Sequence, residues 1–333
     1  MRTNTRILAA AATASLALSA STTTVVAAEP PPSTGEAKAV RVFLLAGQSN
    51  MEGHGVVDLD HERDYNGGRG NLVEFLASDD GAPWRDLRSD AGGWTERDDV
   101  FVSYLTERGE LKSGPLSIGF GVHSGRHHIG PELGIGLILG DAFDEPVLLV
   151  KTCWGGKSLA KDFRPPSAGG EVGPYYRRML AEYRQAIATM AERFPALAGR
   201  TPKLEGVVWF QGWNDACDRD ATATYAANLK HLVADLRTEF DAATLPVVVG
   251  ETGNWDGEQF RSAQREGCEG LEAVVFVPTR RFLRPAESCP NRTHGHHWYG
   301  SGGSYLQAGD AMGRAMRTLT SSAGATEPSA PSR

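Results

Sequence analysis

The sequence predicts an α/β protein in which a central, mostly parallel sheet carries helices on both faces. One observation is that apolar, β-branched runs of strand length alternate with helical segments of about ten to twenty residues. Another is that several of these runs end abruptly in glycine, as buried strands do before tight turns. Together they predict a three-layer α/β/α sandwich with the carboxyl ends of the parallel strands along one edge.

Each element follows from a local pattern. The five strands are expected at residues 42–47, 146–151, 204–210, 245–250 and 273–277. Helices are expected at 130–143, 175–194, 222–240 and 257–266, and a closing helix at 304–320. Pro131 stands where proline is common at a helix start. At 333 residues, one domain with an insertion is the simplest organisation.

The first 28 residues resemble an export signal. Arg2 and Arg6 precede an apolar core at 7–20, and small residues provide a cleavage site after Ala28. The apolar core is shorter than the roughly 20 residues that a membrane-spanning helix needs. We therefore expect a secreted protein, extracellular or periplasmic.

The mature chain is expected to contain one domain with flexible ends. A Pro- and Ser-rich leader is expected at 29–38, the domain at 39–320 and a disordered tail at 321–333. A long Gly-, Asp- and Arg-rich insertion at about 56–126 is expected to be either functional loop or a disordered insertion. Its Trp84 and Trp94 are expected to pack in a small core, with stacking on sugar rings as the alternative.

Charge and cysteine content limit the partners and the compartment. The formal charge is -7, and it becomes -9 when Arg2 and Arg6 are removed with the signal. A mildly acidic chain has no electrostatic footprint for nucleic acid or anionic membranes. In an oxidising compartment the four cysteines predict one or two disulfides, with Cys268–Cys289 the most local pair. The others are Cys153 and Cys217.

A zinc site is the competing explanation for the cysteines, but the chain contains no Cys-x-x-Cys pair. The sequence leaves the disulfide pairing and the oligomeric state open.

Several polar or glycine residues follow the ends of the expected strands. In chain order they are Ser49, Gly156 and Asn214, followed by three histidines of a loop at 284–300, His294, His296 and His297. Each has an ordinary structural explanation, such as a helix cap for Ser49 and Asn214 or a turn for Gly156. Because parallel strand ends meet at one edge of a sheet, we expect these residues to share one site.

This set of residues has the composition that acyl transfer requires. Ser49 supplies a hydroxyl nucleophile, and a histidine with a pKa near the working pH is needed to take its proton. The backbone N–H groups of Ser49 and Gly156 and the side-chain amide of Asn214 are candidate donors to an oxyanion.

Three blocks identify a family. They are residues 47–51 (GQSNM), 154–158 (WGGKS) and 209–215 (WFQGWND). With them the sequence resembles the SGNH hydrolase superfamily and, more closely, the sialate O-acetylesterase-like carbohydrate esterases, including carbohydrate esterase family six of acetyl xylan esterases. The resemblance covers most of the chain from residue 42 to residue 316.

The resemblance implies an activity and roles for individual residues. It implies a flavodoxin-like sheet and a serine esterase that acts on acetylated carbohydrate without metal or organic cofactor. Ser49 would be the nucleophile, Gly156 and Asn214 would complete the oxyanion hole, and His297 would be the base, with His296 as the alternative.

The acid partner of the base is left open. The family usually has Asp three residues before its catalytic histidine, where this chain has His294. Glu132, Glu251 and Asp215 are candidate acids or orienting partners, and a backbone carbonyl is a further alternative.

Two other functions also stay open, a non-catalytic carbohydrate-binding relative and a short-chain lipase-type esterase. The polar insertion disfavours the lipase-type esterase.

Overall fold

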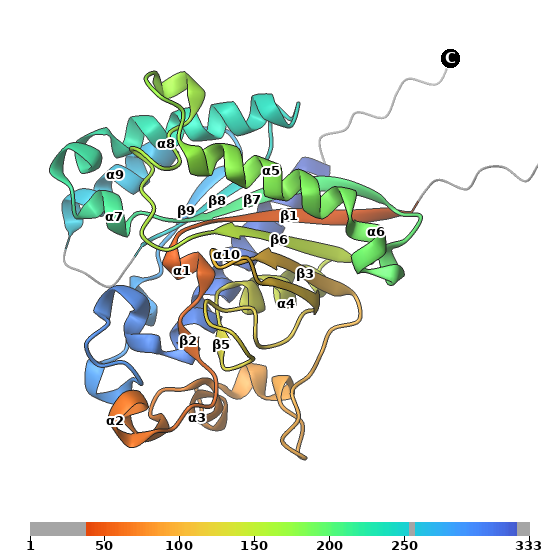
Figure 1. Cartoon of the computed structure of the whole chain (residues 1–333), viewed down its shortest axis with the longest axis vertical. Helices are drawn as coiled ribbons and strands as arrows, with labels where there is room; N and C mark the ends of the chain where they lie inside the picture. The colour runs from red at the N-terminus through yellow and green to blue at the C-terminus, as the bar shows by residue number, and fades with distance from the viewer. Residues whose placement is uncertain (1–37, 253–256, 325–333) are drawn as a thin grey trace, which may run out of the picture. The chain divides into compact units, whose positions relative to one another are not determined.

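The computed structural model describes residues 38–252 and 257–324. Its main sheet has seven strands in the order β4-β3-β6-β1-β7-β8-β9 (Figure 1). The strands are β1 (Ala39–Gly47), β3 (Val100–Leu105), β4 (Leu111–Pro115), β6 (Val147–Cys153), β7 (Thr201–Phe210), β8 (Val247–Gly250) and β9 (Val274–Val277). All neighbours pair in parallel except β3 and β4. A separate antiparallel pair joins β2 (Gly55–Val56) to β5 (His128–Ile129).

The five expected strands are present. The sheet also contains β3 and β4, which the sequence did not lead us to expect. The five form the order β6-β1-β7-β8-β9, which is the flavodoxin-like order 2-1-3-4-5. The two additional strands lie in the segment that was expected to be loop. β3 has no glycine at its end and β4 is not apolar, so the pairing of β3 with β6 and of β4 with β3 had no local signal.

Helices cover both faces of the sheet, which confirms the three-layer sandwich (Figure 1). The longer helices are α4 (Glu132–Gly140), α5 (Pro174–Ala188), α8 (Arg219–Glu239), α9 (Glu258–Cys268) and α10 (Gly302–Gly324). The short ones are α1 (Ser49–Glu52), α2 (Glu62–Tyr65), α3 (Leu72–Ala77), α6 (Met190–Arg193) and α7 (Trp213–Ala216). Short 3₁₀ segments are η1 (Asn66–Gly68), η2 (Ala82–Leu87), η3 (Pro166–Ala168), η4 (Pro195–Leu197), η5 (Arg280–Phe282), η6 (Ala286–Ser288) and η7 (Gly295–Gly300).

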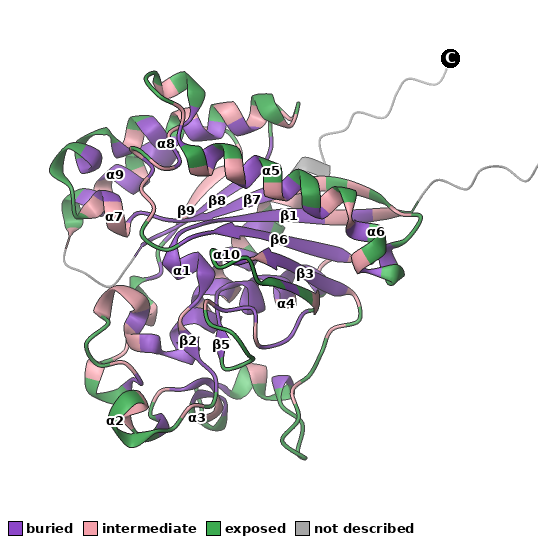
Figure 2. Cartoon of the chain, viewed as in Figure 1, coloured by how far each residue is buried: buried purple, intermediate pink, exposed green. Residues whose placement is uncertain are grey.

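Two apolar clusters, one on each face, hold the layers together. In β1, Val42 and Leu44 contribute to the cluster beneath α5, α8 and α9, whereas Phe43 and Leu45 contribute to the cluster with α4 and α10. All four side chains are fully buried. Figure 2 shows the central strands of the sheet buried, with α5 and α8 exposed on their outer sides. A strand buried on both faces explains why this run of sequence is continuously apolar.

The other sequence expectations have mixed outcomes. Trp84 and Trp94 pack against the cluster that contains α4 and α10, as expected. The expected disulfides are absent, because all four cysteines are free thiols. Cys268 packs in the core beneath α8 and α9, whereas Cys289 lies in a loop against Gly70, so proximity in sequence did not bring this pair together.

The ends of the chain are only partly described. The expected signal at 1–28, the leader up to residue 37 and the tail from residue 325 lie outside the described residues. α10 continues past its expected end at residue 320. Within the described ranges, no helix has the length and apolar character needed to cross a membrane.

Candidate active site

Ser49 lies at the carboxyl edge of the sheet, where β1 turns into α1. A Cβ atom on Gly47 would lie 2.3 Å from the carbonyl oxygen of Phe210, so the last residue of β1 must be glycine for β7 to approach. The chain then turns sharply, and Ser49 becomes the first residue of α1. Its side chain is held in a nearly buried position at the centre of the strand edge.

His297 is the histidine that reaches Ser49. Its Nε2 lies 2.9 Å from the Ser49 Oγ, although the two residues are far apart in sequence. The ring of His296 stacks instead on Trp213, with ring centroids 5.2 Å apart. Asn50 fixes the histidine loop from the other side, since its Nδ2 donates to the carbonyl oxygen of His296 over 3.1 Å. The two segments that carry the serine and the imidazole are therefore joined directly.

The surroundings of His297 favour its neutral form. The pKa of His297 is lowered to about 3, mainly by burial and additionally by the nearby His296 and His294. A neutral imidazole can accept the proton of the Ser49 hydroxyl. The next two residues, Trp298 and Tyr299, have φ angles of 55° and 52°, which are unusual for bulky side chains. Backbone strain is thus located immediately after this imidazole.

Asn214 and Gly156 face each other beside the serine turn. The Nδ2 of Asn214 donates to the carbonyl oxygen of Gly156 over 3.0 Å. The Gly156 φ of 73° is a left-handed conformation that glycine adopts without strain. The preceding Gly155 lies close to the serine turn, since a Cβ atom on it would be 3.7 Å from the Cβ of Ser49.

Asp215 anchors the loop that follows the glycine turn. Its carboxylate accepts the N–H groups of Leu159 and Ala160, each over 2.8 Å, and the side-chain amide of Gln211 over 2.6 Å. Burial raises the pKa of Asp215, while these hydrogen bonds act in the opposite direction. All its contacts indicate a structural role for this carboxylate.

The other two candidate acids are also engaged elsewhere. Glu132 forms a fully buried ion pair with Lys151, with Oε2 and Nζ 2.8 Å apart. Glu251 pairs with Arg261 and accepts the backbone N–H of Thr279 over 2.8 Å. Within the described residues, no carboxylate is hydrogen-bonded to the imidazole beside the serine. The structure therefore places none of the three candidate acids in the position of an acid partner.

Four polar residues at the site were not singled out from the sequence. They are Gln48, Asn50, His54 and Gln211. Gln48, Asn50 and Gln211 stand beside Ser49 or Asn214 within the family blocks and are almost completely buried, which is rare for polar side chains. Their position next to the candidate residues was a usable signal. His54 had none, because only the tertiary structure brings its ring against His297.

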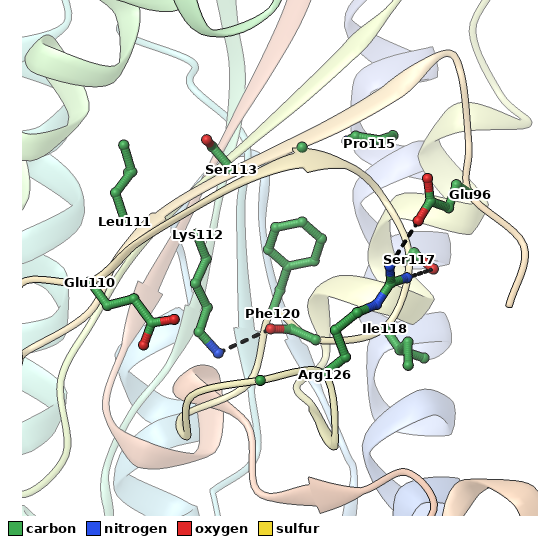
Figure 3. A pocket seen from close by; sticks show the side chains of 13 residues that line it. Glu96, Glu110, Leu111, Lys112, Ser113, Pro115, Ser117, Ile118, Phe120 and Arg126 are labelled. Atoms are coloured by element: carbon green, nitrogen blue, oxygen red, sulfur yellow. Dashed lines mark hydrogen bonds and ion pairs between the residues drawn. The ribbon is translucent and has the colours of Figure 1, made fainter.

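A pocket beside β4 is separate from this site. Its lining, shown in Figure 3, includes Lys112 and Arg126. Lys112 donates to the carbonyl oxygens of Gly119 and Gly121, and Arg126 pairs with Glu96. These charges are satisfied within the protein. Among the residues that the structure describes, no group of three or more His, Cys, Asp or Glu side chains could hold a metal ion.

Comparisons with known proteins give a family and a fold. Residues 39–302 match the family described as carbohydrate esterase, sialic acid-specific acetylesterase. A search of curated protein sequences gave no significant match. A protein from Arabidopsis thaliana of known structure is 17% identical, with a TM-score of 0.54 over 84% of this chain and 98% of that chain.

Two further solved structures are similar. A carbohydrate acetylesterase from Xanthomonas citri is 15% identical, with a TM-score of 0.49 over 84% of this chain and 57% of that chain. NanS is 16% identical, with a TM-score of 0.44 over 73% of this chain and 78% of that chain.

These findings differ in what they support. At 17% identity, the likeness to the Arabidopsis protein shows a shared fold. The family match spans most of the described domain and includes Ser49, Gly156, Asn214 and His297. The chain therefore belongs to the family of carbohydrate esterases described as sialic acid-specific acetylesterases.

Proposed function

We propose that this chain is a secreted serine esterase that removes acetyl groups from carbohydrate, with acetylated xylan or O-acetylated sialic acid as the type of substrate. The observation that carries the proposal is the 2.9 Å contact between the Ser49 hydroxyl and the neutral imidazole of His297. Membership of the family supports an acetylated carbohydrate as substrate. The proposed reaction requires no metal or organic cofactor.

In the first half of the reaction, the Ser49 Oγ attacks the ester carbonyl carbon while its proton passes to Nε2 of His297. The N–H groups of Ser49 and Gly156 and the amide of Asn214 donate to the oxyanion. That amide donates one of its two N–H groups to the Gly156 carbonyl oxygen in the structure, and its second N–H can donate to the oxyanion. The sugar alcohol leaves with the proton from His297.

In the second half, water attacks the acetyl group on Ser49. His297 takes a proton from the water and returns it to the serine oxygen as the acyl bond breaks. The products are acetate and the free serine.

The experiment is acetate release from acetylated xylan and from O-acetylated sialic acid. Ser49→Ala should abolish acetate release and leave the fold intact. Ser103→Ala is the matched control and should retain acetate release. Ser103 is a buried serine of β3 whose hydroxyl accepts a hydrogen bond from Arg193, away from the site. Activity retained in Ser49→Ala would contradict the proposal.

The same preparation separates the alternatives. Binding of an acetylated glycan without acetate release would indicate a carbohydrate-binding protein. Hydrolysis of long acyl esters faster than acetyl esters would indicate a lipase-type esterase. For secretion, amino-terminal sequencing of the protein recovered outside the cytoplasm should begin at residue 29.

A further inference from the structure

The group that lies flat against the imidazole of His297 is a second imidazole. The rings of His54 and His297 are stacked, with centroids 3.8 Å apart and planes inclined by 10°. We propose that His54 is the positioning residue of the base: its ring holds the plane of the His297 imidazole toward Ser49 and its π face stabilises the imidazolium that forms. The inference rests on the proposed serine-esterase function. It assigns to a neutral ring the task that a carboxylate performs in a Ser-His-Asp triad.

The backbone fixes His54 before any substrate binds. α1 is followed by its C-cap Gly53, whose φ is 95°, and a Cβ atom there would lie 2.1 Å from the Cα of Gly130. Only glycine permits this close contact, which directs the following residue over the base. The carbonyl oxygen of Gly53 also accepts the N–H of Val122 over 3.0 Å. The ring of His54 therefore extends from a backbone segment that is held on two sides.

The other histidines near His297 are not placed for this role. The ring of His296 is tilted by 53° to that of His297 and stacks on Trp213. The His294 ring is farther away, 6.4 Å between centroids, and is nearly perpendicular at 78°. Of the three neighbours, His54 alone presents a parallel face.

A neutral His54 is required, because a second cation at this distance would repel the imidazolium. Burial lowers the pKa of His54 well below its ordinary value, and His297, His123, His128 and His296 lower it further. Beyond them, Arg108 and Lys112 face His123. Within residues 38–252 and 257–324, no carboxylate is among the groups that shift the pKa of His54 or His297.

A cation over the face of a neutral aromatic ring is stabilised by the ring quadrupole. The imidazolium forms as the Ser49 proton is transferred, so this attraction acts in the transition state rather than in the ground state. Loss of the π face should therefore lower kcat and leave KM nearly unchanged.

The test compares His54→Phe with His54→Leu. Phenylalanine keeps a flat π face without titrating, whereas leucine keeps apolar bulk and removes the face. We expect His54→Phe to retain kcat and His54→Leu to lose between about twofold and thirtyfold. His123→Phe is the matched control, because its ring meets His54 edge-on at 5.8 Å and makes no ring contact with His297.

A second readout does not depend on turnover. NMR titration of the His297 imidazole should give a pKa near 3 in the wild type, and the acid limb of kcat/KM should lie at the same pH. His54→Ala exposes the His297 imidazole to water, so its pKa and the pH of the acid limb should both rise toward 6.5. His54→Phe keeps the imidazole covered and should leave both low.

The outcomes separate this inference from the proposed function. If Ser49→Ala retains acetate release, the proposed function fails. The NMR titration still tests the contact between the two rings in that case. If His54→Phe and His54→Leu have the same kcat, or if His54→Ala leaves the His297 titration unchanged, the assignment of His54 is overturned.

Discussion

The side-chain amides of Gln48 and Asn214 are hydrogen-bonded, with Nε2 of Gln48 donating to Oδ1 of Asn214 over 3.1 Å. The Oε1 of Gln48 accepts the backbone N–H of Gly212 over 3.0 Å. Because Oδ1 of Asn214 is thereby fixed as an acceptor, its Nδ2 must point the other way, toward Gly156. The residue before Ser49 thus orients the candidate oxyanion donor.

Replacement of Gln48 by Glu should lower kcat about tenfold to a hundredfold, because a carboxylate still accepts from Gly212 but cannot donate to Asn214. KM should change little, since the oxyanion forms only in the transition state. The measurement is steady-state hydrolysis of an acetyl ester. Gln185→Glu, an exposed change on α5, controls for the added charge. An unchanged kcat in Gln48→Glu would show that Asn214 does not depend on this contact.

Folding stability should fall as the pH falls below about 6.5. The pKa of His128 and of His297 is lowered to about 3 in the folded protein, mainly by burial, so the unfolded chain binds more protons between pH 3 and the ordinary value of 6.5. Each group should reduce the free energy of unfolding by about 1.4 kcal/mol per pH unit across that window. Above about pH 6.5, the contribution of these neutral imidazoles to folding stability is fully present.

Urea unfolding at about pH 5.5 and about pH 4.0, both within this window, measures this slope. His128→Gln should make the slope shallower by about 1.4 kcal/mol per pH unit, and His297→Gln should do the same. Slopes equal to that of the wild type in both variants would show that these imidazoles are not held neutral.

Asp215→Asn should reduce stability more than catalysis. The carboxylate accepts from Leu159, Ala160 and Gln211 with two oxygens, whereas Asn has only one acceptor oxygen. Urea unfolding should therefore show a loss of about 1–3 kcal/mol in the free energy of unfolding. Asp218→Asn is the matched control, because Asp218 caps α8 and Asn caps equally well. If Asp215 were the acid partner of the base, Asp215→Asn would instead lower kcat by about 10⁴.

The buried ion pair of Lys151 and Glu132 should show strong energetic coupling. Removing one partner, as in Lys151→Met or Glu132→Leu, leaves an uncompensated buried charge and should cost about 3–5 kcal/mol. The double variant removes both charges and should be more stable than the sum of the two losses predicts. Urea unfolding of the four proteins gives the coupling energy, and strictly additive losses would contradict the pairing.

Local patterns in the sequence predicted most of the sheet and the positions of the candidate residues. The strand before Gly47 is recognisable because both faces are buried and each residue is therefore apolar. Glycine at the strand end marks the turn that carries Ser49. Parallel strands place such turns at one edge, which is why Ser49, Asn214 and His297 could be expected together despite their separation in sequence.

Contacts between distant segments decided the rest. β3 depends on pairing with β6, and β4 depends on pairing with β3. The cysteine pairing expected from sequence proximity did not form, because Cys268 and Cys289 pack in different environments. The partner of His297 was sought among acids, but its ring contacts His54. Short-range patterns report which residues are buried, whereas only the packing of one segment against another determines which side chains meet.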